Sequence, residues 1–218
     1  MSSQSEQNGN EPGGHVYPAA PSHSPISKAL ETSYRSSAAL GSDSLARANH
    51  PGIVSSERMA LLVDGSNLFY AASYLGIEID YLRLLSALTA ERQLLRAYFY
   101  TGVDPHNEKQ RGFLLWLSRH GYRVISKDLM QYTDGSRKAN LHVEMAVDML
   151  QLAEHCSTVT VLSGDGHLTY ALDALSRRGV RIEVVSLQSM TSDALIDIAD
   201  CYTDLADLQT QIRKQRRL

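Results

Sequence analysis

Two aspartates that follow strand-like runs are the residues of this sequence best suited to phosphate chemistry. Asp64 ends the apolar run of "LLVDGSN", shortly before Asn67, and Asp165 follows a second such run in "TVLSGDGHL". Two carboxylates that meet at one edge of a sheet repel each other unless a cation lies between them. Hard oxygen ligands suit Mg²⁺ or Mn²⁺, and such an ion polarises a phosphate oxygen and activates water. The pair therefore predicts a metal site for phosphodiester hydrolysis.

The residues around the two aspartates fit the same chemistry. We expect Asn67 to orient water or a carboxylate, and Ser66 and Ser163 to donate hydrogen bonds to phosphate oxygens. The neighbouring glycines would let backbone amides approach a phosphate closely. The alternative is that Asp-Gly forms an ordinary turn, or that Asp64 caps a following helix. One such dipeptide favours the turn, whereas two at equivalent strand ends favour a site.

The elements that must position these residues alternate between strands and helices. Short apolar or aromatic runs predict strands, and leucine-spaced or amphipathic segments predict helices. The expected strands are 59–64, 94–102, 122–127, 158–166 (including a turn) and 181–187, and the expected helices are 81–90, 107–121, 140–155, 168–179 and 192–200. This alternation predicts a three-layer α/β domain on a mostly parallel sheet. Ligands of such sheets bind beyond the carboxyl ends of the strands, where both aspartates fall.

Composition limits the cellular setting and the partners. The chain has 218 residues and a formal net charge of -3, so nucleic acid would have to bind a local patch rather than the whole surface. Cys156 and Cys201 fit a reducing compartment better than a disulfide framework. The N-terminus lacks the pattern of a signal peptide, and no apolar run reaches membrane-spanning length. We expect a soluble cytoplasmic protein with no membrane partner.

The chain divides into three segments that differ in composition. Residues 1–56 hold most of the prolines and serine clusters, and predict a disordered tail with one short helix near 27–40. Residues 57–206 form the expected domain, and 207–218 a basic C-terminal tail. The N-terminal tail could dock protein partners, although a plain linker explains its composition equally simply.

Several motifs occur together in an order that resembles a known family. "LLVDGSNLFY", "KANLHVEMAVDML" and "VLSGDGHLTYALDAL", followed by "RGVRIEVVSL", resemble the NYN domain, a branch of the PIN-like ribonucleases, and most of all its LabA-like group. The resemblance runs from Met59 to Leu205. It implies a Rossmann-like PIN-type fold, a divalent metal, RNA as substrate and, in many relatives, a homodimer. Some LabA-like members are linked instead to circadian regulation of gene expression.

The resemblance also implies roles for individual residues. Asp64 matches the metal ligand after the first strand, Asn67 its partner amide, and Asp165 the aspartate after a later strand. Asp148 matches the last acid of the "VEMAVD" motif, and Lys138 matches a lysine expected to hold the scissile phosphate.

Two positions depart from the family pattern. His142 and His167 stand where the family carries aspartates. Imidazole suits Zn²⁺, Mn²⁺ or Fe²⁺ better than Mg²⁺, so both residues become candidate metal ligands. Three outcomes remain open: a weakened or inactive nuclease, a nuclease that uses another metal, and a module that binds RNA or protein and retains only the fold.

The helix that carries His142 holds two further acids. Glu144 and Asp148 are four residues apart and share one face, so either could restore part of the lost charge, with a solvated polar stripe as the alternative. Asp148 is the stronger candidate because it matches the motif. Val143 and Val147, with Leu150, are expected to pack the helix on the sheet.

Aromatic and basic residues offer secondary candidates. Tyr132 is the favoured base-stacking residue, ahead of the other tyrosines near the motifs (Tyr70, Tyr74 and Tyr170). Trp116 is expected in the core, and His120 and His155 at helix C-termini.

Overall fold

The computed structural model describes residues 57–131 and 137–215. The expected N-terminal tail, the short helix near 27–40, the stacking candidate Tyr132 and the last three residues lie outside this part. The described residues form one compact unit.

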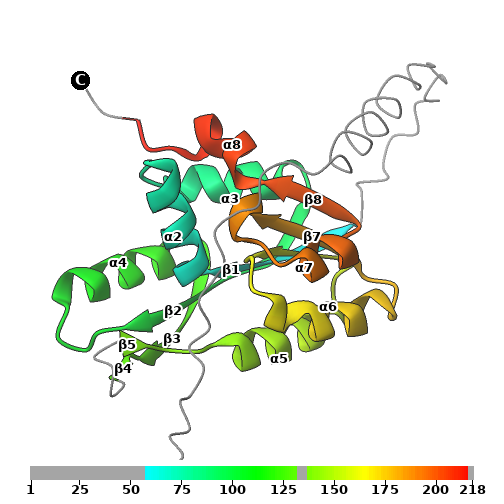
Figure 1. Ribbon diagram of the computed structural model, residues 1–218, viewed down its shortest axis with the longest axis horizontal. Coiled ribbons are helices and arrows are strands. Elements are labelled where there is room, and N and C mark those ends of the chain that lie inside the picture. Colours follow the sequence, from blue (N-terminus) through cyan, green and yellow to red (C-terminus); the bar gives the residue numbers. More distant parts are fainter. Residues whose placement is uncertain (1–56, 132–136, 216–218) are drawn as a thin grey trace, which may run out of the picture. The chain divides into compact units, whose positions relative to one another are not determined.

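A six-stranded sheet forms the centre of the domain, and every pairing in it is parallel (Figure 1). The strand order is β3-β2-β1-β6-β7-β8. The strands are β1 (Arg58–Asp64), β2 (Gln93–Val103), β3 (Tyr122–Asp128), β6 (Thr158–Leu162), β7 (Arg181–Ser186) and β8 (Cys201–Asp204). A separate antiparallel pair joins β4 (Met130–Gln131) to β5 (Arg137–Lys138).

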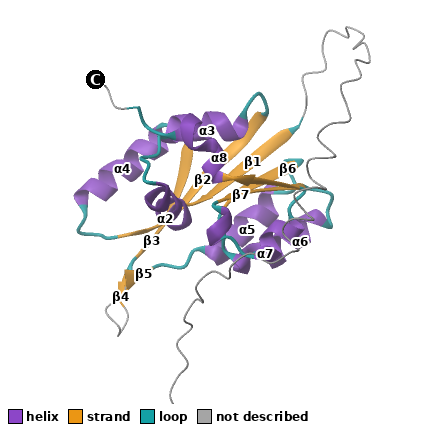
Figure 2. Cartoon of the chain, turned by 45° about the horizontal axis from the view of Figure 1, so that its top comes forward, coloured by secondary structure: helices purple, strands orange, loops and turns teal. Residues whose placement is uncertain are grey.

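Two helical layers cover the two faces of the sheet (Figure 2). The first layer comprises α2 (Gly65–Leu75), α3 (Tyr81–Thr89), α4 (Glu108–Arg119) and α8 (Leu205–Ile212), and the second comprises α5 (His142–Leu152), α6 (Thr169–Ser176) and α7 (Asp193–Ile198). Two 3₁₀ turns, η1 (Gly166–Leu168) and η2 (Gln188–Met190), follow β6 and β7. The expected three-layer α/β class is confirmed.

The buried run of β1 divides between these layers by strand periodicity. Met59, Leu61 and Val63 pack in the core beneath the first layer, whereas Ala60 and Leu62 pack beneath the second. All five are fully buried, because a parallel strand at the centre of a three-layer domain faces a helix layer on each side. This is why β1 reads as a continuous apolar run.

The C-terminal part is more extensively folded than the sequence suggested. The short strand β8 and the helix α8 were not predicted, and Ile212, within the segment expected as a basic tail, is fully buried. Asp204 caps α8 by accepting a hydrogen bond from the Ala206 amide at 2.9 Å. Residues 207–212 therefore pack on the domain rather than extend from it.

Two packing predictions were wrong. Trp116, expected in the core, exposes 37% of its surface and stacks on His120. Val143 and Val147 are exposed, and α5 packs instead through Met145 and Met149, with Leu152. The buried face of α5 therefore lies beside the valine stripe and carries two methionines and a leucine.

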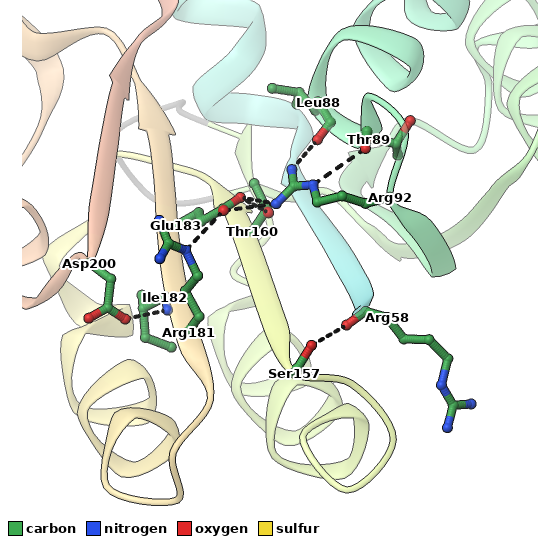
Figure 3. Close-up of polar contacts among 10 residues, drawn as sticks. All are labelled: Arg58, Leu88, Thr89, Arg92, Ser157, Thr160, Arg181, Ile182, Glu183 and Asp200. Carbon is green, nitrogen blue, oxygen red and sulfur yellow. Dashed lines mark hydrogen bonds and ion pairs between the residues drawn. The ribbon is translucent and has the colours of Figure 1, made fainter. Parts of the chain in front are cut away.

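An ionic network joins the start of β2 to the far half of the sheet (Figure 3). Arg92 Nη1 lies 2.8 Å from both carboxylate oxygens of Glu183, and its Nη2 donates to the Leu88 carbonyl at 2.6 Å. Thr160, which is buried, donates to Glu183 at 2.8 Å. The guanidinium thereby ties the α3–β2 turn to β7, while β6 completes the hydrogen bonds of the carboxylate.

Candidate functional site

Asp64 lies at the carboxyl end of β1 and caps α2. Its Oδ1 accepts hydrogen bonds from the backbone amides of Ser66 at 3.0 Å and Asn67 at 3.1 Å. A carboxylate at this position also interacts favourably with the helix dipole. The capping role that the sequence allowed is therefore real, but it uses only one of the two oxygens.

The second oxygen of Asp64 faces the loop that carries Asp165. β1 and β6 pair in register up to Val63 and Leu162, which brings the residues after each strand together. Ser163 Oγ donates to Asp64 Oδ2 at 3.1 Å and accepts from the Asp165 amide at 3.2 Å. Ser163 is fully buried, so its hydroxyl joins the two strand ends and does not face a substrate, contrary to the expected contact with phosphate.

Two histidines complete the cluster. His142, the first residue of α5, has its Nε2 3.6 Å from Asp64 Oδ2 and 3.4 Å from Asp165 Oδ2. His167 Nδ1 lies 2.6 Å from Asp165 Oδ1. The two rings stack with centroids 5.9 Å apart. The structure thus brings Asp64, Asp165 and both histidines to one point beyond the strand ends.

The electrostatics of the cluster follow from these contacts. The close approach of Asp64 raises the pKa of His142, and the charge of Asp165 adds to this effect, against the opposing effect of burial. Burial alone would raise the pKa of Asp165, but hydrogen bonds from the amide and ring of His167, together with the charge of His142, lower it overall. Protonated His142 therefore supplies positive charge between two carboxylates that would otherwise repel each other.

The donor set fits a divalent transition metal better than Mg²⁺. Ligand atoms of His142, Asp165 and His167 all lie within 4.8 Å of one another. Within the described residues, the buried Nδ1 of His142 has no hydrogen-bond partner. Two imidazoles beside carboxylate suit Zn²⁺, Mn²⁺ or Fe²⁺, whereas Mg²⁺ prefers oxygen ligands. His142 must be deprotonated to act as a ligand, so it would exchange its proton for the ion.

Asp148, a predicted ligand, contacts Tyr100 rather than this cluster. The Tyr100 hydroxyl donates to Asp148 Oδ2 at 2.8 Å. Burial raises the pKa of Tyr100 strongly, and the bond to Asp148 raises it further, so the hydroxyl remains a donor at all ordinary pH values. Tyr100 pairs with Asp64 in the β-sheet register, which places the Tyr100–Asp148 contact on the strand adjacent to the site.

Glu144 is also held outside the cluster. Its Oε1 lies 2.5 Å from Lys127 Nζ, and the same ammonium donates to the Asn140 carbonyl at 3.2 Å. Asn140 in turn accepts a hydrogen bond from the His142 amide at 2.9 Å. Lys127, at the end of β3, therefore fixes the segment that delivers His142, and Glu144 adds no charge to the cluster.

Ser66, Lys138 and Asn67 are the remaining predicted site residues. Ser66 is exposed at the start of α2. Lys138 pairs through its backbone with Met130 in the small antiparallel sheet, but its side chain lies outside the described part. The Asn67 side chain is partly exposed and makes no hydrogen bond within the described residues.

The glycines of "SGDG" are required by packing. A Cβ on Gly164 would lie 2.2 Å from the Met190 carbonyl oxygen, and one on Gly166 would lie 2.7 Å from Ser192 Oγ. The Ser192 amide donates to the Gly164 carbonyl at 3.0 Å. Close approach to the segment after β7, rather than to a phosphate, therefore accounts for both glycines.

Sequence reasoning missed the supporting residues of the site. Ser163 was placed at the site but in another role, whereas Tyr100 and Lys127 received no specific role. Their contacts join Tyr100 to Asp148 across 48 positions and Ser163 to Asp64 across 99. A parallel alignment of the expected strands would have been the only sequence signal for them.

No helix in residues 57–131 and 137–215 is long and apolar enough to cross a membrane.

Comparison with known proteins identifies the family. The model of the NYN domain matches residues 58–206. A relative from Synechococcus elongatus, the low amplitude and bright protein LabA, is 36% identical over 169 residues, which cover 73% of this chain and 90% of that protein. A crystal structure of a protein of unknown function from Vibrio parahaemolyticus superposes with a TM-score of 0.61 at 28% identity, covering 68% of this chain and 93% of the other. The chain therefore belongs to the NYN domain family.

Proposed function

We propose that this NYN domain is a divalent-metal-dependent ribonuclease that hydrolyses phosphodiester bonds of RNA. The observation that carries the proposal is the convergence of Asp64, Asp165, His142 and His167 beyond the ends of β1 and β6. Membership of the NYN family, whose nuclease relatives use divalent metals, supports the same conclusion.

Each residue of the site would have a separate role in binding or catalysis. Asp165, His142 and His167 would hold the ion, with Asp64 Oδ2 beside them. When bound, the ion would polarise a phosphate oxygen and lower the pKa of an attacking water. The side-chain amide of Asn67 would orient that water, and the exposed Ser66 hydroxyl would donate to a phosphate oxygen. Lys138 is proposed as a phosphate contact on family resemblance alone.

Zn²⁺ or Mn²⁺ is the proposed ion rather than Mg²⁺. Replacement of two family carboxylates by imidazoles removes two negative charges from the site, which weakens a site for Mg²⁺ and favours metals that accept nitrogen ligands. Restoring both acids, as in the double variant His142→Asp with His167→Asp, should shift metal preference back toward Mg²⁺.

A cleavage assay tests the proposal directly. Labelled single-stranded RNA is incubated with the protein and Mg²⁺, Mn²⁺ or Zn²⁺, and the products are sized. We expect cleavage with Mn²⁺ or Zn²⁺, loss of cleavage in Asp165→Asn and Asp64→Asn, and products that carry a 5′-phosphate. Cleavage that survives both substitutions would come from a contaminant and would refute the proposal. Calorimetric titration with each metal provides a second readout that does not depend on turnover.

A second function is favoured by one specific observation. His142 lies between the two aspartates and, when protonated, takes the place that a cation would occupy. Such a self-neutralised site suits a regulator that binds RNA or protein without hydrolysis, as the likeness to LabA would allow. An inert wild type, combined with metal-dependent cleavage by the double aspartate variant, would establish this alternative.

A further inference from the structure

Three tyrosines on the helices that follow Asp64 and Asp165 leave most of their surface in water. The exposed fractions are 64% for Tyr70, 67% for Tyr74 and 80% for Tyr170. Tyrosine side chains in a folded domain normally bury most of the ring and leave only the hydroxyl at the surface. These three instead present aromatic faces to which a ligand has access.

Two of them form a row that begins at the site. Asn67, Tyr70 and Tyr74 follow one another along α2 at intervals of three and four residues, so they lie on one side of the helix. The row starts beside Asp64, because the Asn67 amide donates to Asp64 Oδ1 at 3.1 Å. A different side of α2 packs on the domain, and its buried residues are Gly65, Leu68, Ala71 and Ala72.

The third tyrosine lies on the opposite side of the cluster. Tyr170 follows His167 by three residues at the start of α6, and both side chains are highly exposed. The His167 ring stacks on His142, whose Nε2 is 3.6 Å from Asp64. α2 and α6 cover opposite faces of the sheet (Figure 2), so Tyr70 and Tyr74 are carried on one side of it and Tyr170 on the other.

We propose that Tyr70, Tyr74 and Tyr170 form stacking platforms for the unpaired bases of an RNA strand that crosses the carboxyl edge of the sheet. The strand would place a phosphate at the Asp64–Asp165 cluster and bases on either side of it. This inference rests on the proposed function, and it specifies single-stranded rather than duplex RNA. In a duplex the bases stack on each other and their faces are closed to aromatic side chains.

The charges near the site favour stacking as the source of affinity. The chain has a formal net charge of -3, and the cluster adds two carboxylates at the place where a phosphate must lie. Lys127, a cation close to the start of α5, is already paired with Glu144 at 2.5 Å. Base stacking needs no positive charge, so it can supply affinity that the carboxylates and the paired Lys127 do not.

An exposed aromatic residue on another helix supplies the control. Phe69 is unsuitable, because its ring lies edge-on against the ring of Tyr70 with centroids 5.7 Å apart. Trp116, on α4, exposes 37% of its surface and stacks on His120. It lies outside the tyrosine row, in the lining of an apolar cavity of about 560 Å³.

The test measures binding of three strands of equal length by fluorescence anisotropy. The strands are an unpaired RNA, an abasic strand with the same number of phosphates, and an RNA duplex, each measured in EDTA and again in Ca²⁺. Each tyrosine is changed to leucine, which keeps an apolar side chain but removes the aromatic face, and to phenylalanine, which keeps the face. Trp116→Leu is the control, and circular dichroism verifies the fold of every variant.

The expected pattern is specific to stacking. Each Tyr→Leu variant should bind the unpaired RNA about fivefold or more weakly, whereas each Tyr→Phe variant and Trp116→Leu should remain within about twofold of the wild type. The wild type should prefer the unpaired RNA to both the abasic strand and the duplex. Leucine should remove that preference.

Other outcomes overturn the inference. Equal binding of the abasic strand, no loss in the Tyr→Leu variants, equal loss in the Tyr→Phe variants, or no binding of RNA at all would each do so. A surface for a protein partner would give the last result. The cleavage assay is interpreted separately. If the protein cleaves RNA with metal but its binding does not depend on the tyrosines, only the stacking proposal is refuted. If binding depends on the tyrosines but no cleavage occurs, only the proposed hydrolysis is refuted.

Discussion

The glycine that precedes Asp165 offers a quantitative test of how the site is built. In a Gly164→Ala variant the new Cβ would lie 2.2 Å from the Met190 carbonyl oxygen, far inside the 3.0 Å that real Cβ contacts respect. The obstructing atom belongs to the backbone, so the segment after β7 must move as a unit. The hydrogen bond from the Ser192 amide to the Gly164 carbonyl, 3.0 Å long, would be strained or lost.

The expected cost follows from these two effects. Overpacking of a tight site costs about 1–3 kcal/mol, and the backbone hydrogen bond adds about 1 kcal/mol. For a domain of this size, a loss of about 2–4 kcal/mol lowers the melting temperature by roughly 5–15 °C. Because Gly164 immediately precedes Asp165, the variant should also weaken metal binding.

Calorimetric unfolding and metal titration measure the two consequences together. Gly112→Ala is the matched control, because a Cβ there meets nothing within 4 Å and the position lies inside α4. Alanine in a helix interior is more stable than glycine by about 0.5–1 kcal/mol, so the control should unfold at a higher temperature than the wild type. A Gly164→Ala protein as stable as the wild type would refute the close-packing explanation of "SGDG".

Two further predictions concern side chains outside the cluster. Burial alone would raise the pKa of Glu183, but its bonds to Arg92 and a neighbouring threonine lower the pKa overall. The stabilisation from ionised Glu183 is therefore complete at pH values above the ordinary pKa of 4.5 and is lost as the pH falls through the lowered pKa. Below pH 4.5, the free energy of unfolding measured in urea should therefore change less steeply with pH in Glu183→Gln than in the wild type. Equal pH dependence in the two proteins would contradict this. Tyr100→Phe should lower the free energy of unfolding by about 1–3 kcal/mol, since it leaves Asp148 without its donor. The matched change Tyr98→Phe, on the same strand face, should cost less, and equal losses would show that the bond to Asp148 contributes nothing.

Most of the strands and helices were readable from local patterns, although α2 and the short strands β4 and β5 were not among the expected elements. Run length and periodicity are properties of neighbouring residues, so "MALLVD" predicted a strand buried on both faces and "NEKQRGFLLWLSRHG" an amphipathic helix. The N-cap role of Asp64 was likewise readable as an alternative. The four-residue strand β8 was not, because a strand so short has no pattern that distinguishes it from a loop. The burial of α8 was not readable either, because it depends on which elements β8 brings next to this helix.

The sequence by itself determined the family pattern, the fold class, and the identity of Asp64, Asp165, His142 and His167 as candidate site residues. Only the tertiary structure decided how those residues meet, because their contacts depend on the parallel register of β1 and β6 and on where α5 begins. That register buries Ser163 between the two aspartates. The position of α5 directs Asp148 toward Tyr100 and places an imidazole, rather than open space, between the carboxylates. A linear motif specifies which side chains a site contains, but the distances and charges among them arise only when strands far apart in sequence pair.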